Sequence, residues 1–249
     1  MTLLLQTLRN VMYTVVVSLW VLIATIVLGS TVIVTAFFSE KGNGPHLIAR
    51  AWARSILWIS RVNVELKGLD NLPLDAPCIL MPIHQSNFDI PVLLGRLPIQ
   101  FRWLAKAELF KIPIFGRGMR GCGYISIDRS NRKSAFKSLA DAAQRIRDGA
   151  SVLIFPEGTR SRDGEIGAFK KGGFVLTVDA GVPIVPIIIY GTRAIMPKGS
   201  LLLKPGGAYM EILPPIASSG YTRETKDQLI MVIRETLLTA FDRVREKQL

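Results

Sequence analysis

The stretch PCILMPIHQSNFD, residues 77–89, decides the fold, because an apolar run ends there in a cluster of polar residues. The run 78–83, CILMPI, is continuously apolar, which is typical of a strand buried on both faces of a parallel sheet. His84 therefore stands at the end of a predicted strand, where the functional sites of open α/β sheets lie. The chain has only one other histidine, His46. A histidine at the end of a predicted strand therefore makes residues 84–89 a candidate functional site.

Short runs of strand-like composition recur along the chain, and helical patterns separate several of them. The other runs are VNVELKG (62–68), FRWLA (101–105), GYISID (123–128), SVLIF (151–155), VPIVPIIIY (182–190) and AYMEIL (208–213). An apolar stripe at helical spacing predicts a helix over 134–148, and Thr222 is a predicted cap of a C-terminal helix. This alternation indicates an α/β fold with a mostly parallel or mixed central sheet that is flanked by helices.

The amino-terminal region has the composition of a membrane segment. Residues 11–38 carry no charged side chain, and as a helix they would be about 42 Å long against roughly 30 Å of bilayer hydrocarbon. The run is too long for a signal peptide and lacks a clear cleavage site. The whole chain is also basic, with 31 Lys and Arg against 19 acids. This balance suits a membrane surface, a nucleic acid or phosphorylated small molecules.

The region after the apolar run predicts how the chain meets the membrane. Its cations, which outnumber Arg9, are Lys41, Arg50, Arg54, Arg61 and Lys67. If the apolar helix spans, this asymmetry places the rest of the chain in the cytoplasm. Residues 45–60 fit a helix that lies in the interface with Arg50 and Arg54 toward lipid phosphates, so a hairpin dipping into one leaflet is an alternative to a span. We expect membrane-anchoring helices over 1–60 and an α/β domain over 61–249.

His84 and Asp89 can form an acid–base pair if the chain turns between them. Neutral imidazole accepts a proton near pH 7, and a carboxylate can fix its tautomer and balance the resulting charge. The two side chains converge if 84–87 is a turn and Asp89 lies in the first turn of a helix over 88–97. The alternative is a structural histidine with a capping aspartate. A Ser86–His84–Asp89 triad is disfavoured, because Ser86 is poorly placed to reach the ring and the chain has no G-x-S-x-G elbow.

A second candidate loop follows the predicted strand at 151–155. In SVLIFPEGTRSRDG (151–164), proline and glycine shape a tight turn that carries Arg160, whose planar guanidinium suits phosphate. The alternative is an ordinary charged turn.

Two other motifs are rejected. GRGMRG (116–121) precedes a strand instead of opening a helix after one, so it is no dinucleotide site. GAFKKGG (167–173) lacks the Lys-Ser/Thr of a nucleotide loop. Two cysteines and two histidines offer no metal site.

Several of these stretches, in this order, resemble the glycerolipid acyltransferase family. HQSNFD matches its H-x4-D motif and FPEGTRS (155–161) its F-P-E-G-T-R-S motif, while 105–129 and 182–187 are similar to its second and fourth blocks. The resemblance covers about residues 65–200 and is closest to the bacterial 1-acyl-sn-glycerol-3-phosphate acyltransferases. Ile83 stands where the family usually has asparagine.

The resemblance implies transfer of a fatty acyl group from a thioester to the sn-2 hydroxyl of lysophosphatidic acid, which gives phosphatidic acid. It assigns catalysis to His84, Asp89 and Lys106, with Lys106 or a nearby backbone N–H holding the oxyanion. It assigns acceptor binding to Arg129, Glu157, Gly158, Thr159 and Arg160. The two arginines would clamp the phosphate, and Glu157 would position the acceptor's glycerol or an arginine. Residues 182–189 would be a core strand or line an acyl groove.

The resemblance further implies no cofactor and no metal, with acyl-CoA or acyl-ACP (acyl carrier protein) as co-substrate. The implied partners are the lipid bilayer and lysophosphatidic acid, and the implied location is the cytoplasmic membrane with the catalytic domain on the cytoplasmic side. A different acceptor, such as glycerol-3-phosphate or another lysolipid, is the nearest alternative. A catalytically idle membrane scaffold leaves the intact motifs unexplained, and no specific nucleic-acid-binding motif accompanies the positive charge.

Overall fold

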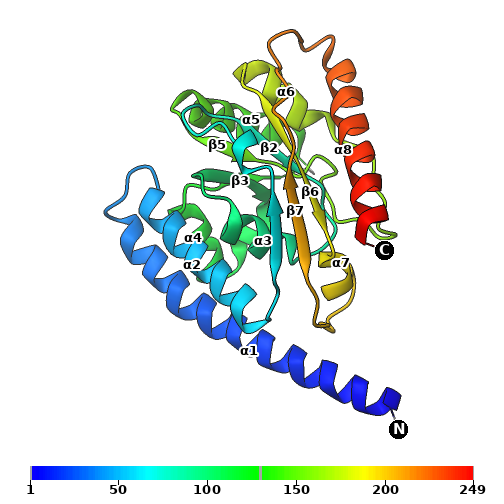
Figure 1. The fold of residues 1–249 in the computed structure, drawn as a ribbon. Helices are drawn as coiled ribbons and strands as arrows, with labels where there is room; N and C mark the ends of the chain where they lie inside the picture. The colour runs from blue at the N-terminus through cyan, green and yellow to red at the C-terminus, as the bar shows by residue number, and fades with distance from the viewer. Residues whose placement is uncertain (1, 129–130, 249) are drawn as a thin grey trace.

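The computed structural model describes residues 2–128 and 131–248, and their centre is a sheet with helices on both faces (Figure 1). The strands are β1 (Val64–Lys67), β2 (Ile79–Pro82), β3 (Phe101–Lys106), β4 (Ile125–Ile127), β5 (Ser151–Leu153), β6 (Ile184–Tyr190) and β7 (Ala208–Ile212). Each falls on one of the predicted runs.

The sheet is mixed, with the order β1-β7-β6-β2-β5-β3-β4. The strands from β6 to β4 are parallel to one another, and β7 and β1 run in the opposite direction. The predicted α/β class with a mostly parallel or mixed sheet is therefore confirmed. The carboxyl ends of β2, β5 and β3 meet at one edge, so the residues that follow these strands come together there.

Two helical layers cover the sheet. The helices are α1 (Thr2–Ala36), α2 (Asn43–Ile59), α3 (Asp89–Arg96), α4 (Phe115–Gly121), α5 (Arg132–Arg147), α6 (Lys171–Ala180), α7 (Thr192–Ile195) and α8 (Lys226–Gln248), with short 3-10 helices η1 (Leu69–Asn71) and η2 (Ala107–Lys111). One core forms where α1 to α4 pack on the sheet, and a second forms beneath α5, α6 and α8. The side chains of a buried strand point alternately into the two cores. In β2, Leu80 belongs to the first core, and Ile79 and Met81 belong to the second.

The predicted helix boundaries are close to those of the structure, with one clear difference. Helix α3 begins at Asp89 and α5 at Arg132, each within two residues of the predicted start. Helix α8 begins at Lys226 instead of just after Thr222. The Thr222 hydroxyl accepts from the backbone N–H of Glu224, at 3.2 Å, and so closes a turn ahead of the helix instead of capping it.

Helix α1 is long and apolar enough to cross a membrane over Leu4–Ala36. It packs along α2 as an antiparallel hairpin (Figure 1), and the Trp52 indole donates to Thr25 across the interface at 3.0 Å. Val17 and Val32 belong to the core, whereas most of the other large apolar side chains of α1 are exposed. This apolar surface supports the association of the protein with a membrane.

The arginines of α2 correct one expectation. The guanidinium of Arg50 is buried and donates to the carbonyl oxygens of Pro98 and Ile99, at 3.3 and 2.7 Å. The prediction that it faces lipid phosphates is wrong, because the chain that leaves α3 offers it carbonyl oxygens inside the protein. Arg54 stays exposed and donates to Gly95 in the last turn of α3, whose carbonyl groups lack helical partners.

The glycines of GRGMRG serve helix packing. They lie on α4, which abuts α1. A Cβ atom at Gly121 would lie 2.8 Å from the Cβ atom of Ala36, and one at Gly116 would lie 2.3 Å from the carbonyl oxygen of Phe110. The pattern therefore reflects close approach of backbones, in agreement with the rejection of a dinucleotide site.

Candidate active site

His84 and Asp89 meet at the carboxyl end of β2. The chain turns after His84, and Asp89 opens α3, so that His84 Nδ1 lies 2.8 Å from Asp89 Oδ2. This is the convergence that the turn-and-helix prediction required. With Nδ1–H donated to the carboxylate, the hydrogen-bond network leaves Nε2 as the proton acceptor of the ring. The ring stacks on Phe155, with centroids 3.7 Å apart and planes 13° apart, and this contact fixes its plane.

The Asp89 carboxylate is fully buried and surrounded by donors. Oδ2 also accepts from the backbone N–H groups of Gln85 and Ser86, at 2.7 and 2.9 Å. Oδ1 accepts from the Thr192 hydroxyl at 2.6 Å, across 103 residues of sequence. Because buried charges are tolerated when hydrogen bonds satisfy them, these donors hold a negative charge directly behind the imidazole.

Ser86 has no access to a substrate. Its side chain is fully buried and donates to the carbonyl oxygen of Met196 at 2.8 Å, while it accepts from the backbone N–H of Phe88 at 3.1 Å. The hydroxyl therefore stabilises the turn and does not point at the ring of His84. This geometry agrees with the rejection of a serine nucleophile.

The other histidine is a core residue. His46 is fully buried, and its Nδ1 lies 3.1 Å from the Tyr124 hydroxyl. Burial, followed by repulsion from Arg102 and Arg50, lowers the pKa of His46 to about 3. It therefore stays neutral over the physiological range, and its burial separates it from any substrate.

Glu157 links the two motif loops instead of facing outward. Oε1 accepts from the backbone N–H of His84 at 2.9 Å, and Oε2 accepts from that of Gly167 at 3.0 Å. Its side chain is almost fully buried, and this burial raises its pKa although the two N–H groups oppose the shift. Among the described residues the carboxylate pairs with no arginine and instead braces His84 from beneath through the two backbone N–H groups. Glu157 also lines the cavity described below, so its contact with the acceptor's glycerol stays a prediction.

Replacing Glu157 by glutamine is expected to destabilise the protein although it removes a buried charge. One of the two backbone N–H groups would then face an amide NH2, which is a second donor. An unsatisfied buried donor costs about 1–3 kcal/mol, which corresponds to about 2–4 °C in Tm per kcal/mol for a chain of this size. Thermal unfolding of Glu157→Gln beside the wild type measures this, and an equal or higher Tm would contradict the brace.

Residues 158–161 form the loop that follows β5. Gly158 has φ +70°, a conformation that favours glycine. Thr159 is exposed, and Arg160 is half-buried beside the cavity described below, with no carboxylate paired to its guanidinium within residues 2–128 and 131–248. The Ser161 N–H donates to the carbonyl oxygen of His84 at 2.8 Å, so the two motif loops are joined by backbone as well.

The remaining predicted residues differ in what the structure says of them. Lys106 ends β3 at the same edge of the sheet; its side chain is 63% exposed and lies 3.1 Å from Glu108. An ammonium this exposed can turn from Glu108 toward a developing anion. Arg129 lies outside the described residues.

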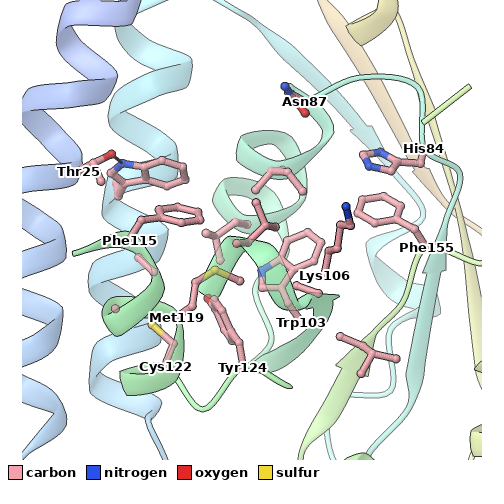
Figure 2. Close-up of a pocket in the computed structure, with 18 of the residues that line it drawn as sticks. Thr25, His84, Asn87, Trp103, Lys106, Phe115, Met119, Cys122, Tyr124 and Phe155 are labelled. Atoms are coloured by element: carbon pink, nitrogen blue, oxygen red, sulfur yellow. Dashed lines mark hydrogen bonds between the residues drawn. The ribbon is translucent and has the colours of Figure 1, made fainter. Parts of the chain in front are cut away.

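A cavity of about 710 Å³ opens beside His84. Figure 2 shows His84, Phe155 and Lys106 at one side of it and the apolar side chains of Trp103, Phe115 and Met119 farther in. Its other walls come from α1, α2 and α3. Residues of β6 lie in the core instead of the cavity wall, so the acyl-groove alternative for 182–189 is wrong.

Three residues near the site escaped prediction. Phe155 stacks on the base, Thr192 binds Asp89, and Lys198 donates to Thr159 and to the carbonyl oxygen of Arg160. Two of them had a usable signal: Phe155 opens the FPEGTRS motif, and Thr192 stands two residues after β6, the strand that pairs with β2. Among the described residues, no group of three His, Cys, Asp or Glu side chains is placed to hold a metal ion.

The fold and the site together define a membrane-associated α/β protein with an acid–base pair and the cations Lys106 and Arg160 at an apolar cavity. The model of the acyltransferase family matches residues 63–190, and the chain belongs to this family. The predicted resemblance is therefore confirmed.

The relatives carry related names. The chain is 40% identical over 176 residues to the chloroplastic 1-acyl-sn-glycerol-3-phosphate acyltransferase BAT2 of Brassica napus, covering 70% of this chain and 51% of that one. It is 35% identical over 180 residues to the 1-acyl-sn-glycerol-3-phosphate acyltransferase of Pseudomonas aeruginosa, covering 70% and 69%. The chain spans about half the length of the chloroplastic relatives from Brassica napus and Arabidopsis thaliana.

A solved structure extends the likeness to the whole chain. The crystal structure of the 1-acyl-sn-glycerophosphate acyltransferase PlsC from Thermotoga maritima matches with a TM-score of 0.82 at 26% identity. The match covers 96% of this chain and 98% of that one, so it includes the α1–α2 hairpin as well as the sheet.

Proposed function

We propose that the protein is a membrane-bound 1-acyl-sn-glycerol-3-phosphate O-acyltransferase, which transfers a fatty acyl group from a thioester to the sn-2 hydroxyl of lysophosphatidic acid. The observation that carries the proposal is the His84–Asp89 pair, 2.8 Å apart, at the mouth of an apolar cavity with Lys106 and Arg160 beside it. A base, an anion site and an acyl-sized apolar space are the three things this reaction needs.

In the proposed mechanism, Nε2 of His84 removes the proton of the acceptor hydroxyl as its oxygen attacks the thioester carbonyl carbon. Asp89 balances the imidazolium that forms. The tetrahedral oxyanion is held by Lys106 or by a backbone N–H near it. When the C–S bond breaks, the thiolate leaves and takes the proton from His84, so the products are the ester and a free thiol. The burial of Ser86 supports direct transfer without an acyl-enzyme.

The acceptor phosphate binds the cations of the second loop in this proposal. Arg160 offers a planar fork with no carboxylate partner in the described part of the chain, and Gly158 lets the backbone come close. Thr159 offers an exposed hydroxyl at the same place. The resemblance assigns a second phosphate contact to Arg129.

In this proposal the α1–α2 hairpin holds the active site at the membrane surface, where the lipid substrates are. The exposed apolar face of α1 and the exposed Phe37 and Phe38 at the tip of the hairpin fit insertion into one leaflet, because α1 packs along α2 and α4 instead of standing free. The acyl chain would enter the apolar cavity. The excess of cations after α1 favours the cytoplasmic side. The thioester of acyl-CoA or acyl-ACP provides the activation, so the reaction needs no further cofactor.

Purified protein in detergent or vesicles, offered labelled acyl-CoA or acyl-ACP and a panel of acceptors, tests the proposal. The panel contains lysophosphatidic acid, glycerol-3-phosphate, lysophosphatidylcholine and monoacylglycerol. We expect phosphatidic acid to be the main product, and His84→Ala to form it about 10³-fold more slowly. Acylation of another acceptor at a higher kcat/KM than lysophosphatidic acid would overturn the proposed acceptor, and no transfer to any of them would overturn the proposed reaction.

Replacing Arg160 by alanine is expected to raise KM for lysophosphatidic acid about 10- to 100-fold, because a hydrogen bond between charged groups is worth about 1.5–3 kcal/mol. The KM for the acyl donor should change little. Arg162→Ala is the matched control, since Arg162 is an exposed arginine two residues farther along that does not line the cavity. An unchanged acceptor KM in Arg160→Ala would remove Arg160 from the phosphate site.

A further inference from the structure

The segment 191–204, which lies in the connection from β6 to β7, contacts both motif loops although it belongs to neither. It begins with α7, where Thr192 binds Asp89, and continues to Met196, whose carbonyl oxygen accepts from Ser86. Two contacts thus hold the loop of the catalytic base. The next contacts of the segment go to the other loop, which carries Arg160.

Lys198 holds the backbone of Arg160. Its ammonium group donates to the Arg160 carbonyl oxygen at 2.6 Å and to the Thr159 hydroxyl at 3.0 Å. The N–H of the same peptide group, from Ser161, donates to the carbonyl oxygen of His84 at 2.8 Å. Both polar atoms of one peptide unit are therefore fixed, and this unit sets the direction in which the Arg160 side chain leaves the backbone.

Lys198 itself stands on a closed and anchored loop. The Lys204 N–H donates to the carbonyl oxygen of Ile195 at 2.9 Å, and the Ser200 N–H donates to that of Pro197 at 3.1 Å. The Leu203 N–H donates to the Thr14 hydroxyl of α1 at 2.8 Å. Figure 1 shows α7 at the end of the sheet near α1. The lysine is half-buried, and its position is set by these bonds instead of by a surface ion pair.

We propose that Lys198 is a positioning residue of the acceptor-phosphate site. It fixes the Arg160–Ser161 peptide so that the Arg160 guanidinium is presented to a phosphate monoester. The inference rests on the proposed function, because it takes Arg160 as a phosphate ligand. The structure places Lys198 behind the Arg160 backbone and outside the cavity lining, so in this proposal it acts through Arg160. Its charge suits this role, since a cation bound to a carbonyl oxygen polarises the peptide without competing for the anion.

The test compares Lys198→Met with Lys204→Met, which removes an exposed lysine from the same segment. We expect Lys198→Met to raise KM for lysophosphatidic acid about tenfold, while kcat and the donor KM stay within about twofold. Lys204→Met should leave all three unchanged. Lys198→Arg, which keeps the charge and the donors, should recover most of the acceptor affinity. A fall in kcat and a rise in the donor KM as large as the rise in the acceptor KM would indicate general damage to the fold and would overturn the proposal.

A double-mutant cycle separates positioning from independent effects. If Lys198 acts through Arg160, the acceptor KM of Lys198→Met combined with Arg160→Ala should equal that of Arg160→Ala alone. Multiplication of the two effects would overturn the proposal. The same outcome does not affect the proposed function, which fails only if the wild type transfers no acyl group or prefers another acceptor to lysophosphatidic acid. The acylation of monoacylglycerol, which has no phosphate, should not respond to Lys198→Met at all.

Discussion

Replacing His84 by alanine is expected to lower kcat for acyl transfer about 10³-fold, with the fold intact. A positioned general base contributes about 10²–10⁴-fold, and the described site offers no second imidazole that could take over, because His46 is buried in the core. The side chain of His84 is partly exposed and makes its contacts with Asp89 and Phe155, so its loss removes no large part of either core. Steady-state kinetics and thermal unfolding of the purified variant measure the two quantities.

Added imidazole provides the control for this prediction. Alanine leaves a space between Asp89 and Phe155 that has the shape of the missing ring, so millimolar imidazole should restore part of the activity of His84→Ala. It should have no effect on the wild type. A variant that keeps more than about a tenth of the wild-type kcat would remove His84 from the role of base.

Replacing Asp89 by asparagine is expected to lower kcat about 10²- to 10³-fold while Tm changes little. The amide oxygen can occupy the place of Oδ2, where it would accept from His84 and from the two backbone N–H groups. The amide NH2 would then face the Thr192 hydroxyl, which can turn to accept. The hydrogen bonds are kept and only the charge is lost, so the effect on kcat reports the stabilisation of the imidazolium.

Asp89→Ala is the matched variant, because it removes the acceptor as well as the charge. It leaves the N–H groups of Gln85 and Ser86 without a partner inside the protein, and should cost about 1–3 kcal/mol for each unsatisfied group. Its Tm should therefore fall well below that of Asp89→Asn. A wild-type kcat in Asp89→Asn would show that the carboxylate serves the structure of the turn alone.

The sequence predicted the strands and the meeting of His84 with Asp89, because both are local properties. A continuously apolar run such as 78–83 indicates a buried strand whatever surrounds it, and five residues separate the base from its partner. The rule that sites lie at the carboxyl ends of parallel strands then brings 84–89 and 156–160 to one edge. Such inferences need only periodicity and connectivity.

The contacts that could not be predicted come from remote parts of the chain. Thr192 reaches Asp89 across 103 residues, and Glu157 bonds the His84 backbone across 73. No sequence pattern distinguishes a carboxylate that binds backbone N–H groups from one that binds a substrate, so Glu157 was expected to position the acceptor's glycerol or an arginine, and its bonds to the backbone were not predicted. The prediction for Arg50 was wrong for the same reason. The spacing of Arg50 and Arg54 on one helix face is equally compatible with binding to lipid phosphates and with binding to the carbonyl oxygens after α3.

The α1–α2 hairpin, whose exposed face is apolar, also forms part of the cavity beside His84. Thr25, Leu28 and Val32 of α1 form one side of the cavity, and the glycines of α4 let that helix pack closely against α1. Removing α1 to obtain a water-soluble fragment would open one side of this cavity and expose its aromatic lining to water. Truncation of α1 therefore cannot yield a soluble fragment that keeps the cavity intact. The full chain has to be studied with the apolar face of α1 covered by detergent or lipid.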